Sequence, residues 1–172
     1  MLSWTADRYP SRKAVGGAQP LTYRQWDART NQLARALASL GVRPGDRVAV
    51  LLAGGEPMAS LHLAVQKLGA ASVPLSVRFG PTELAYCVGD ADPMLVIVDE
   101  TTQASLSAVL GKPPQDRTAL DQLARHEPDG ELGEGPRPED VSVILYTSGT
   151  TGRPKGVPRT HRAEHAAAGS KT

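Results

Sequence analysis

The sequence has little of what marks an extracellular, disulfide-stabilised protein. Its 172 residues include a single cysteine, Cys87, so no disulfide can form within the chain. This favours a reducing compartment. Aromatic residues make up only 4% of the chain, whereas 40% of it is hydrophobic. Alanine, leucine and valine must therefore fill most of the core.

The signatures of membrane and nucleic-acid-binding proteins are missing as well. No apolar run approaches the ~18 residues that a membrane helix needs. Residues 1–10 are mixed and carry Asp7 and Arg8 where a signal peptide would be apolar. The formal net charge is +1, and no Lys/Arg cluster is interleaved with aromatic residues. We expect a cytoplasmic protein with no membrane span and no nucleic-acid partner.

In the first half of the sequence, patterns typical of helices alternate with patterns typical of strands. Thr22 and Gln25 form a capping-box pair, and an apolar helical repeat runs from Trp26 to Leu40 before Gly41. Further helices are expected to begin at the prolines 57 and 81, and strands are expected at 47–52, 71–75 and 94–98. This alternation predicts an α/β fold with a mostly parallel sheet and flanking helices.

The second half of the sequence is less regular. Helices are expected at 101–110 and 119–126, and a fourth strand at 141–146. Between them, residues 127–140 are rich in acidic residues, proline and glycine, which predicts a surface loop or linker. The length suits one domain rather than two.

The fourth strand leads into the twelve residues 146–157, which read YTSGTTGRPKGV. Glycines let a backbone turn sharply and bring its N–H groups close to a ligand. The hydroxyls of Ser148, Thr150 and Thr151 can donate to phosphate oxygens. Lys155 adds a mobile positive charge. N–H groups, hydroxyls and a lysine together are what binding of a polyphosphate requires.

Other nucleotide motifs do not fit this segment. A Walker A loop places Gly-Lys before Ser or Thr and opens a helix, whereas Lys155 follows Pro154 and precedes Gly156, Val157 and Pro158. The alternating glycines of a dinucleotide site are absent too. A loop rich in Gly, Ser and Thr is by itself most often only a flexible connection, but this string is far more specific.

The segment resembles the signature loop of the adenylate-forming (AMP-binding) superfamily, which comprises acyl-CoA synthetases, luciferases and the adenylation domains of peptide synthetases. Earlier stretches are similar to that family in the same order: LGVRPGDRVA at 40–49, LGAA at 68–71 with VPL at 73–75, and Glu83-Leu84 with Tyr86. The resemblance implies that residues 1–172 are the N-terminal part of the large domain of such an enzyme.

The resemblance also implies a reaction in two steps. A carboxylic acid attacks ATP, with Mg²⁺, to give an acyl adenylate, and CoA then displaces AMP to form a thioester. Carried over position by position, the residues that bind the ATP phosphates are Thr147, Ser148, Gly149, Thr150, Thr151, Gly152 and Lys155. No catalytic residue and no metal ligand is assigned within 1–172.

Details within the family favour the acid–CoA ligases. Ser76 to Pro81 replace the Asp-Pro and Tyr-Pro steps of peptide-synthetase domains, and Pro158 to Arg162 continue as in CoA ligases. An adenylation domain that loads a carrier protein is the alternative within the family. The family's adenine, ribose and acid-pocket segments and its C-terminal lid have no counterpart in 1–172. The other reading is therefore a truncated, non-catalytic remnant, and we expect this segment alone to be inactive.

Several other residues have side chains that could carry chemistry, and for most of them an ordinary structural role is expected. His161 follows the loop and is a further candidate for contact with phosphate or acid, and equally for a helix-start residue. His62 and His165 are expected to be surface or packing residues, and Cys87 a buried packing residue. Glu83 is expected to be an acid of a helix's first turn, favoured by the helix dipole.

Overall fold

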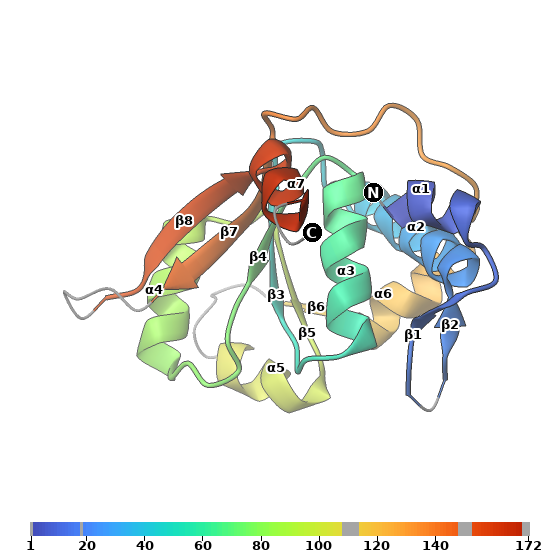
Figure 1. Ribbon diagram of the computed structural model, residues 1–172. Helices are drawn as coiled ribbons and strands as arrows, with labels where there is room; N and C mark the ends of the chain where they lie inside the picture. The colour runs from blue at the N-terminus through green and yellow to red at the C-terminus, as the bar shows by residue number, and fades with distance from the viewer. Residues whose placement is uncertain (1, 18, 108–113, 148–152, 170–172) are drawn as a thin grey trace.

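The computed structural model describes residues 2–17, 19–107, 114–147 and 153–169 (Figure 1). Its helices are α1 (Leu2–Arg8), α2 (Tyr23–Ser39), α3 (Glu56–Lys67), α4 (Pro81–Ala91), α5 (Glu100–Ser107), α6 (Arg117–Ala124) and α7 (His161–Gly169). Its strands are β1 (Lys13–Val15), β2 (Leu21–Thr22), β3 (Arg47–Leu51), β4 (Ala71–Pro74), β5 (Leu95–Val98), β6 (Gln115–Asp116), β7 (Val141–Thr147) and β8 (Lys155–Thr160). The predicted alternation of helices and strands is confirmed.

Six of the strands form one sheet in the order β6-β5-β3-β4-β7-β8. Every neighbouring pair is parallel except β7 and β8, which form an antiparallel hairpin at one edge. The α/β fold with a mostly parallel sheet is therefore confirmed. β1 and β2 pair separately.

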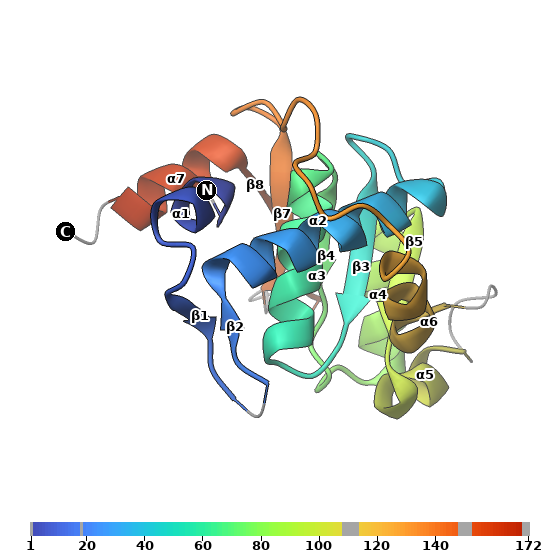
Figure 2. The same ribbon diagram turned by 90° about the vertical axis from the view of Figure 1, so that its right-hand side faces the viewer.

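Both faces of the central strand β3 are buried, and alternate side chains enter two different cores. Val48, Val50 and Leu52 pack with α2, α3 and α6, whereas Ala49 and Leu51 pack with α4 and α5. This period of two is expected for a strand covered by helices on both sides. Figures 1 and 2 show the resulting three layers.

The helix boundaries follow local chemistry. The Thr22 side chain accepts from the Gln25 N–H and the Gln25 side chain accepts from the Thr22 N–H, so the predicted capping box opens α2. α3 begins at Glu56, one residue earlier than predicted, and Pro57 lies in its first turn. α5 and α6 both begin earlier than predicted, and residues 108–110 of the expected helix lie outside the described residues.

Residues 127–140 contain no helix or strand and lie along α2. The guanidinium of Arg35 donates to the carbonyls of Pro128, Gly130 and Glu131, at 2.7–2.8 Å. Asn31 and Gln32 donate to two more carbonyls of this segment. Side chains of α2 therefore attach this segment through its main-chain carbonyls and not through its acidic side chains.

Candidate functional site

The candidate phosphate-binding segment leaves the sheet at its carboxyl edge. β7 runs parallel to β4, so Thr147 at the end of β7 lies at the same edge as the ends of β3, β4 and β5. Open α/β sheets bind ligands at this edge, close to the point where the strand order reverses. The chain returns along β8, so Thr147 and Lys155 form the last pair at this end of the β7–β8 hairpin.

Thr147 and Lys155 are paired directly across the hairpin. Directly opposed residues of an antiparallel pair present their side chains on the same face, with Cβ atoms about 5 Å apart. Both residues are exposed. The Lys155 ammonium makes no ion pair or side-chain hydrogen bond with another described residue. A hydroxyl and an uncommitted cation thus flank the segment from the two strands.

The remaining predicted phosphate-binding residues lie outside the described residues. These are Ser148, Gly149, Thr150, Thr151 and Gly152. They lie in sequence between Thr147 and Arg153, so the strands bring both ends of the predicted set to one place. Their contribution stays a prediction from the sequence.

Arg153 is a second cation beside the segment, and the sequence reasoning did not single it out. Its guanidinium lies 5.5 Å from the centroid of the Tyr86 ring on α4. The side chain is exposed. The only signal in the sequence was a basic residue next to a Gly-rich segment, which by itself is common on protein surfaces.

The structure does not bring His161 together with Lys155. His161 begins α7, after the full length of β8. Six residues of extended strand separate the two by about 20 Å. Burial lowers the pKa of His161, an effect that Asp140 opposes. His161 is therefore the first residue of a helix and lies away from the candidate phosphate-binding segment.

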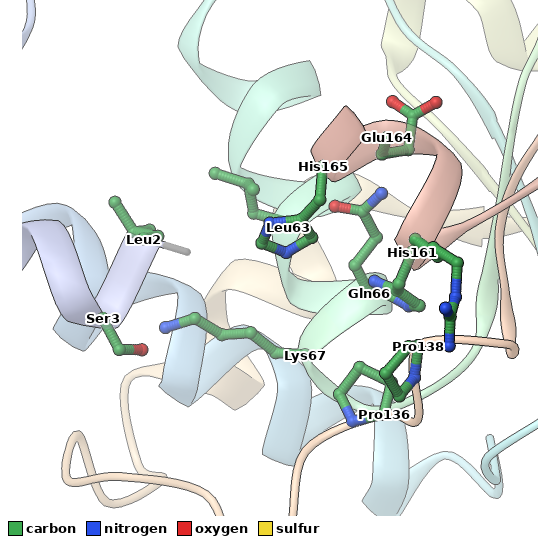
Figure 3. A pocket seen from close by; sticks show the side chains of 11 residues that line it. Leu2, Ser3, Leu63, Gln66, Lys67, Pro136, Pro138, His161, Glu164 and His165 are labelled. Carbon is green, nitrogen blue, oxygen red and sulfur yellow. The ribbon is translucent and has the colours of Figure 1, made fainter. Parts of the chain in front are cut away.

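His161 instead borders a pocket of about 580 Å³ between α1, α3, α7 and the segment at 136–138 (Figure 3). The polar side chains facing it include Gln66, Lys67 and His165. Lys67 is already committed, because its Nζ lies 2.7 Å from Asp27 Oδ1 and 2.5 Å from Asn31 Oδ1. Its charge is therefore not available to neutralise an anionic ligand there.

The described ends of the segment offer a hydroxyl and a cation, both of which are chemically suited to phosphate oxygens. Within the described ranges, no group of three or more His, Cys, Asp or Glu side chains is placed to hold a metal. Mg²⁺ commonly keeps several waters and binds through substrate phosphates. Thr147 offers a hydroxyl donor and Lys155 a counter-charge for the phosphate oxygens of such a complex.

The other residues that the sequence singled out lie at the capping, packing and surface positions expected of them. Glu83 accepts from the Gly80 N–H at 2.9 Å and so caps the start of α4. Cys87 belongs to the same helix and is fully buried. His62 is half-buried on α3 and His165 is exposed on α7. Among the described helices, none is long and apolar enough to cross a membrane.

Comparison with known proteins gives matches along almost the whole chain. A family model described as AMP-binding enzyme matches residues 2–171. The chain is 33% identical over 159 residues to 3-hydroxybenzoate–CoA ligase of Aromatoleum sp. (strain CIB), a match that covers 86% of this chain and 30% of that ligase. It is 38% identical over 152 residues to Malpibaldin synthetase of Mortierella alpina, covering 86% of this chain and 3% of the synthetase.

A solved structure matches as well. The inhibitor-bound N-terminal domain of FACL13 from Mycobacterium tuberculosis superposes with a TM-score of 0.91 at 32% identity, over 98% of this chain and 45% of that one. The chain therefore spans less than half the length of each of these matched proteins.

Proposed function

Because the chain belongs to the family of AMP-binding enzymes, as residues 146–157 predicted, we propose that it supplies the phosphate-binding part of an adenylate-forming ligase. In that reaction a carboxylate attacks the α-phosphorus of ATP, and pyrophosphate leaves. The observation that carries the proposal is the pairing of Thr147 with Lys155 on either side of the Gly-rich segment, at the carboxyl edge of the sheet.

The proposed chemistry is electrostatic. Negative charge builds up on the departing pyrophosphate, and fixed donors and cations aimed at it lower the barrier. Lys155 supplies the cation and Thr147 a hydroxyl. Backbone N–H groups and hydroxyls of Ser148, Gly149, Thr150, Thr151 and Gly152 complete the proposed set. Mg²⁺, when bound with ATP, neutralises further phosphate charge.

For the second step we propose transfer to CoA. The residues Ser76 to Pro81 and Pro158 to Arg162 support this choice, as does the likeness to a 3-hydroxybenzoate–CoA ligase. Loading of a carrier protein is the second candidate, and the likeness to Malpibaldin synthetase favours it. Thioester formation with CoA, but not with a carrier protein, by a complete domain containing this segment would decide for the first.

Residues 1–172 alone are proposed to bind polyphosphate without completing the reaction. The family's adenine, ribose and lid segments have no counterpart within them. The purified chain should show no ATP–pyrophosphate exchange and no acyl-CoA formation above a Lys155→Ala control. Turnover above that control would overturn this part of the proposal, whereas absence of polyphosphate binding would support a non-functional remnant.

The direct test is calorimetric titration of the chain with tripolyphosphate and with MgATP. Lys155→Ala should weaken tripolyphosphate binding on the order of tenfold or more, because a charge-assisted contact is lost. Lys13→Ala removes an exposed lysine from β1 and is the matched control. Equal loss in both variants would mean non-specific charge attraction and would contradict the assignment of Lys155.

A further inference from the structure

The strand that enters the candidate segment is attached to α4 by a side-chain hydrogen bond. The phenol of Tyr146 donates to Asp90 Oδ2 at 2.6 Å, across 56 positions of sequence. Tyr146 immediately precedes Thr147 on β7. Burial, followed by the hydrogen bond to Asp90, raises the pKa of the Tyr146 phenol. The phenol therefore keeps its proton, and with it the donor of this bond, at neutral pH.

Arg153, two residues before β8, contacts the same helix. The Arg153 guanidinium lies over the Tyr86 ring at 5.5 Å. Tyr86 and Asp90 are four residues apart on α4, so they lie on one face of the helix. Both flanks of residues 148–152 are thus attached to a single helix face, one turn apart. Figure 1 shows α4 beside the end of the β7–β8 hairpin.

Gly156 adds a third, independent constraint on Tyr146. The two residues are paired across the hairpin. A Cβ on Gly156 would lie 3.1 Å from Tyr146 Cζ and 3.2 Å from its hydroxyl oxygen. The ring therefore lies across the backbone of β8, where only glycine leaves room for it. Tyr146 is held between β8 on one side and α4 on the other.

These contacts would add little to the stability of the fold, because Asp90 and Arg153 are both exposed and exposed charged contacts contribute little. Their placement suits a different task. Holding Tyr146 and Arg153 in place keeps their neighbours Thr147 and Lys155 opposed before a ligand arrives. A site ordered beforehand pays a smaller ordering cost when it binds.

We propose that Tyr86 and Asp90 of α4 are positioning residues that hold the two flanks of the phosphate-binding segment through Arg153 and Tyr146. The proposal rests on the proposed polyphosphate binding by Thr147 and Lys155. It assigns to α4 a role that its packing in the core does not require. Neither residue touches the ligand; each acts through its partner.

Binding by the 172-residue chain tests the proposal. Asp90→Asn and Tyr146→Phe should each weaken tripolyphosphate binding roughly fivefold, as expected for one side-chain hydrogen bond. The double variant should be no weaker than either single variant, because both remove the same contact. Tyr86→Leu should weaken binding to a similar degree, and Tyr86→Phe should restore it because a phenyl ring still faces Arg153. Asp7→Asn, at an exposed acid on α1, is the matched control.

Two readouts follow the flanks without any ligand. In chain labelled with ¹³C-tyrosine, Asp90→Asn should shift the ring resonance of Tyr146 at neutral pH, because the phenol loses its charged acceptor. Amide hydrogen exchange at residues 153–157 should speed up several-fold in Asp90→Asn and Tyr86→Leu, while exchange in α2 stays unchanged. Additive losses in the Asp90/Tyr146 double variant, or unchanged exchange at 153–157, would overturn the positioning role.

The two proposals fail in different ways. If the wild-type chain does not bind tripolyphosphate, or binds it equally well with Lys155→Ala, the proposed function fails. The exchange and Tyr146 resonance readouts would still decide whether α4 holds the flanks. If Lys155→Ala abolishes binding while the α4 variants bind like wild type, the phosphate site stands and the positioning role falls.

Discussion

Lys67 on α3 and Asp27 on α2 form an ion pair with 2.7 Å between Nζ and Oδ1, and each side chain is only 15% exposed. Asp27 also accepts from the Ser3 hydroxyl and from the Asn31 amide. Burial lowers the pKa of Lys67, and the hydrogen bond to Asp27 opposes this. One carboxylate therefore connects α1, α2 and α3, and two of its partners, Ser3 and Lys67, line the pocket of Figure 3.

Asp27→Ala should accordingly destabilise the chain. It leaves the Lys67 ammonium without its counter-charge and removes an acceptor from two further donors, so we expect a loss of about 2 kcal/mol. Lys67→Met, which removes the charge but keeps the apolar stem, should cost less. Urea denaturation measures both, with Asp7→Ala as the exposed control. A loss below about 0.5 kcal/mol for Asp27→Ala would show that the pair contributes no more than a surface salt bridge.

A second prediction concerns the stability of the fold at acidic pH. Burial lowers the pKa of His62, and His161 adds to the effect while Glu164 opposes it. The folded state thus disfavours the imidazolium, whereas the unfolded chain takes up a proton near the ordinary value of about 6.5. Stability should therefore fall as the pH drops below about 6.5, through the lower folded pKa.

His62→Gln should flatten this loss, since a glutamine does not titrate. Urea midpoints measured between pH 7.5 and 5 would show the change in slope, and the exposed His126→Gln is the matched control. His161 should retain part of the slope, because burial lowers its pKa too. An unchanged pH dependence in His62→Gln would rule out His62 as a source of the acid sensitivity.

The elements that the sequence predicted are those whose signals are local. The capping box of Thr22 and Gln25, the apolar repeat of α2 and the β-branched runs of β3 and β5 each lie within a few residues. The strand β8 was not predicted, because Gly156 and Pro158 argue against a strand. It forms by pairing with β7, and Pro158 is tolerated because β8 is an edge strand.

The candidate site also contains residues that the local sequence predicts and residues that only the packed fold brings together. The pattern at 146–157 predicts a phosphate-binding segment from neighbouring residues alone. Tyr86 and Asp90 could not have been predicted, because they reach Arg153 and Tyr146 only once α4 has packed beside the hairpin. Nothing about an aromatic and an acid on a helix distinguishes them from ordinary helical residues.

Cys87 provides a probe of that packing. The thiol is fully buried, and burial, with smaller contributions from Asp90 and Glu83, raises its pKa to about 11. Native chain at pH 8 should therefore react with a thiol reagent at least about a hundredfold more slowly than urea-unfolded chain, because thiolate forms only after α4 opens. Stopped-flow absorbance with a disulfide reagent gives both rates. Similar rates in the two states would mean that α4 does not cover Cys87 in solution.

The last prediction compares two glycines that differ in their surroundings. A Cβ on Gly156 would lie 3.1 Å from Tyr146 Cζ and 3.2 Å from Ile144 Cγ2, whereas a Cβ on Gly89 of α4 would meet no atom within 4 Å. Gly156→Ala should push the Tyr146 ring and cost about 1 kcal/mol of stability. Gly89→Ala should stabilise the chain by up to about 1 kcal/mol, because alanine favours the helix.

Urea denaturation of the two variants would measure the change in the free energy of unfolding. The ring resonance of ¹³C-labelled Tyr146 would show whether the ring moves. The crowding at Gly156 predicts opposite signs for two identical substitutions, so general effects of an added methyl group cannot produce the pattern. The Tyr146 resonance should shift in Gly156→Ala and stay in place in Gly89→Ala. Stabilisation by Gly156→Ala with an unmoved resonance would show that the Tyr146 ring is not held against β8, and the positioning of the segment by Tyr146 would then lose one of its supports.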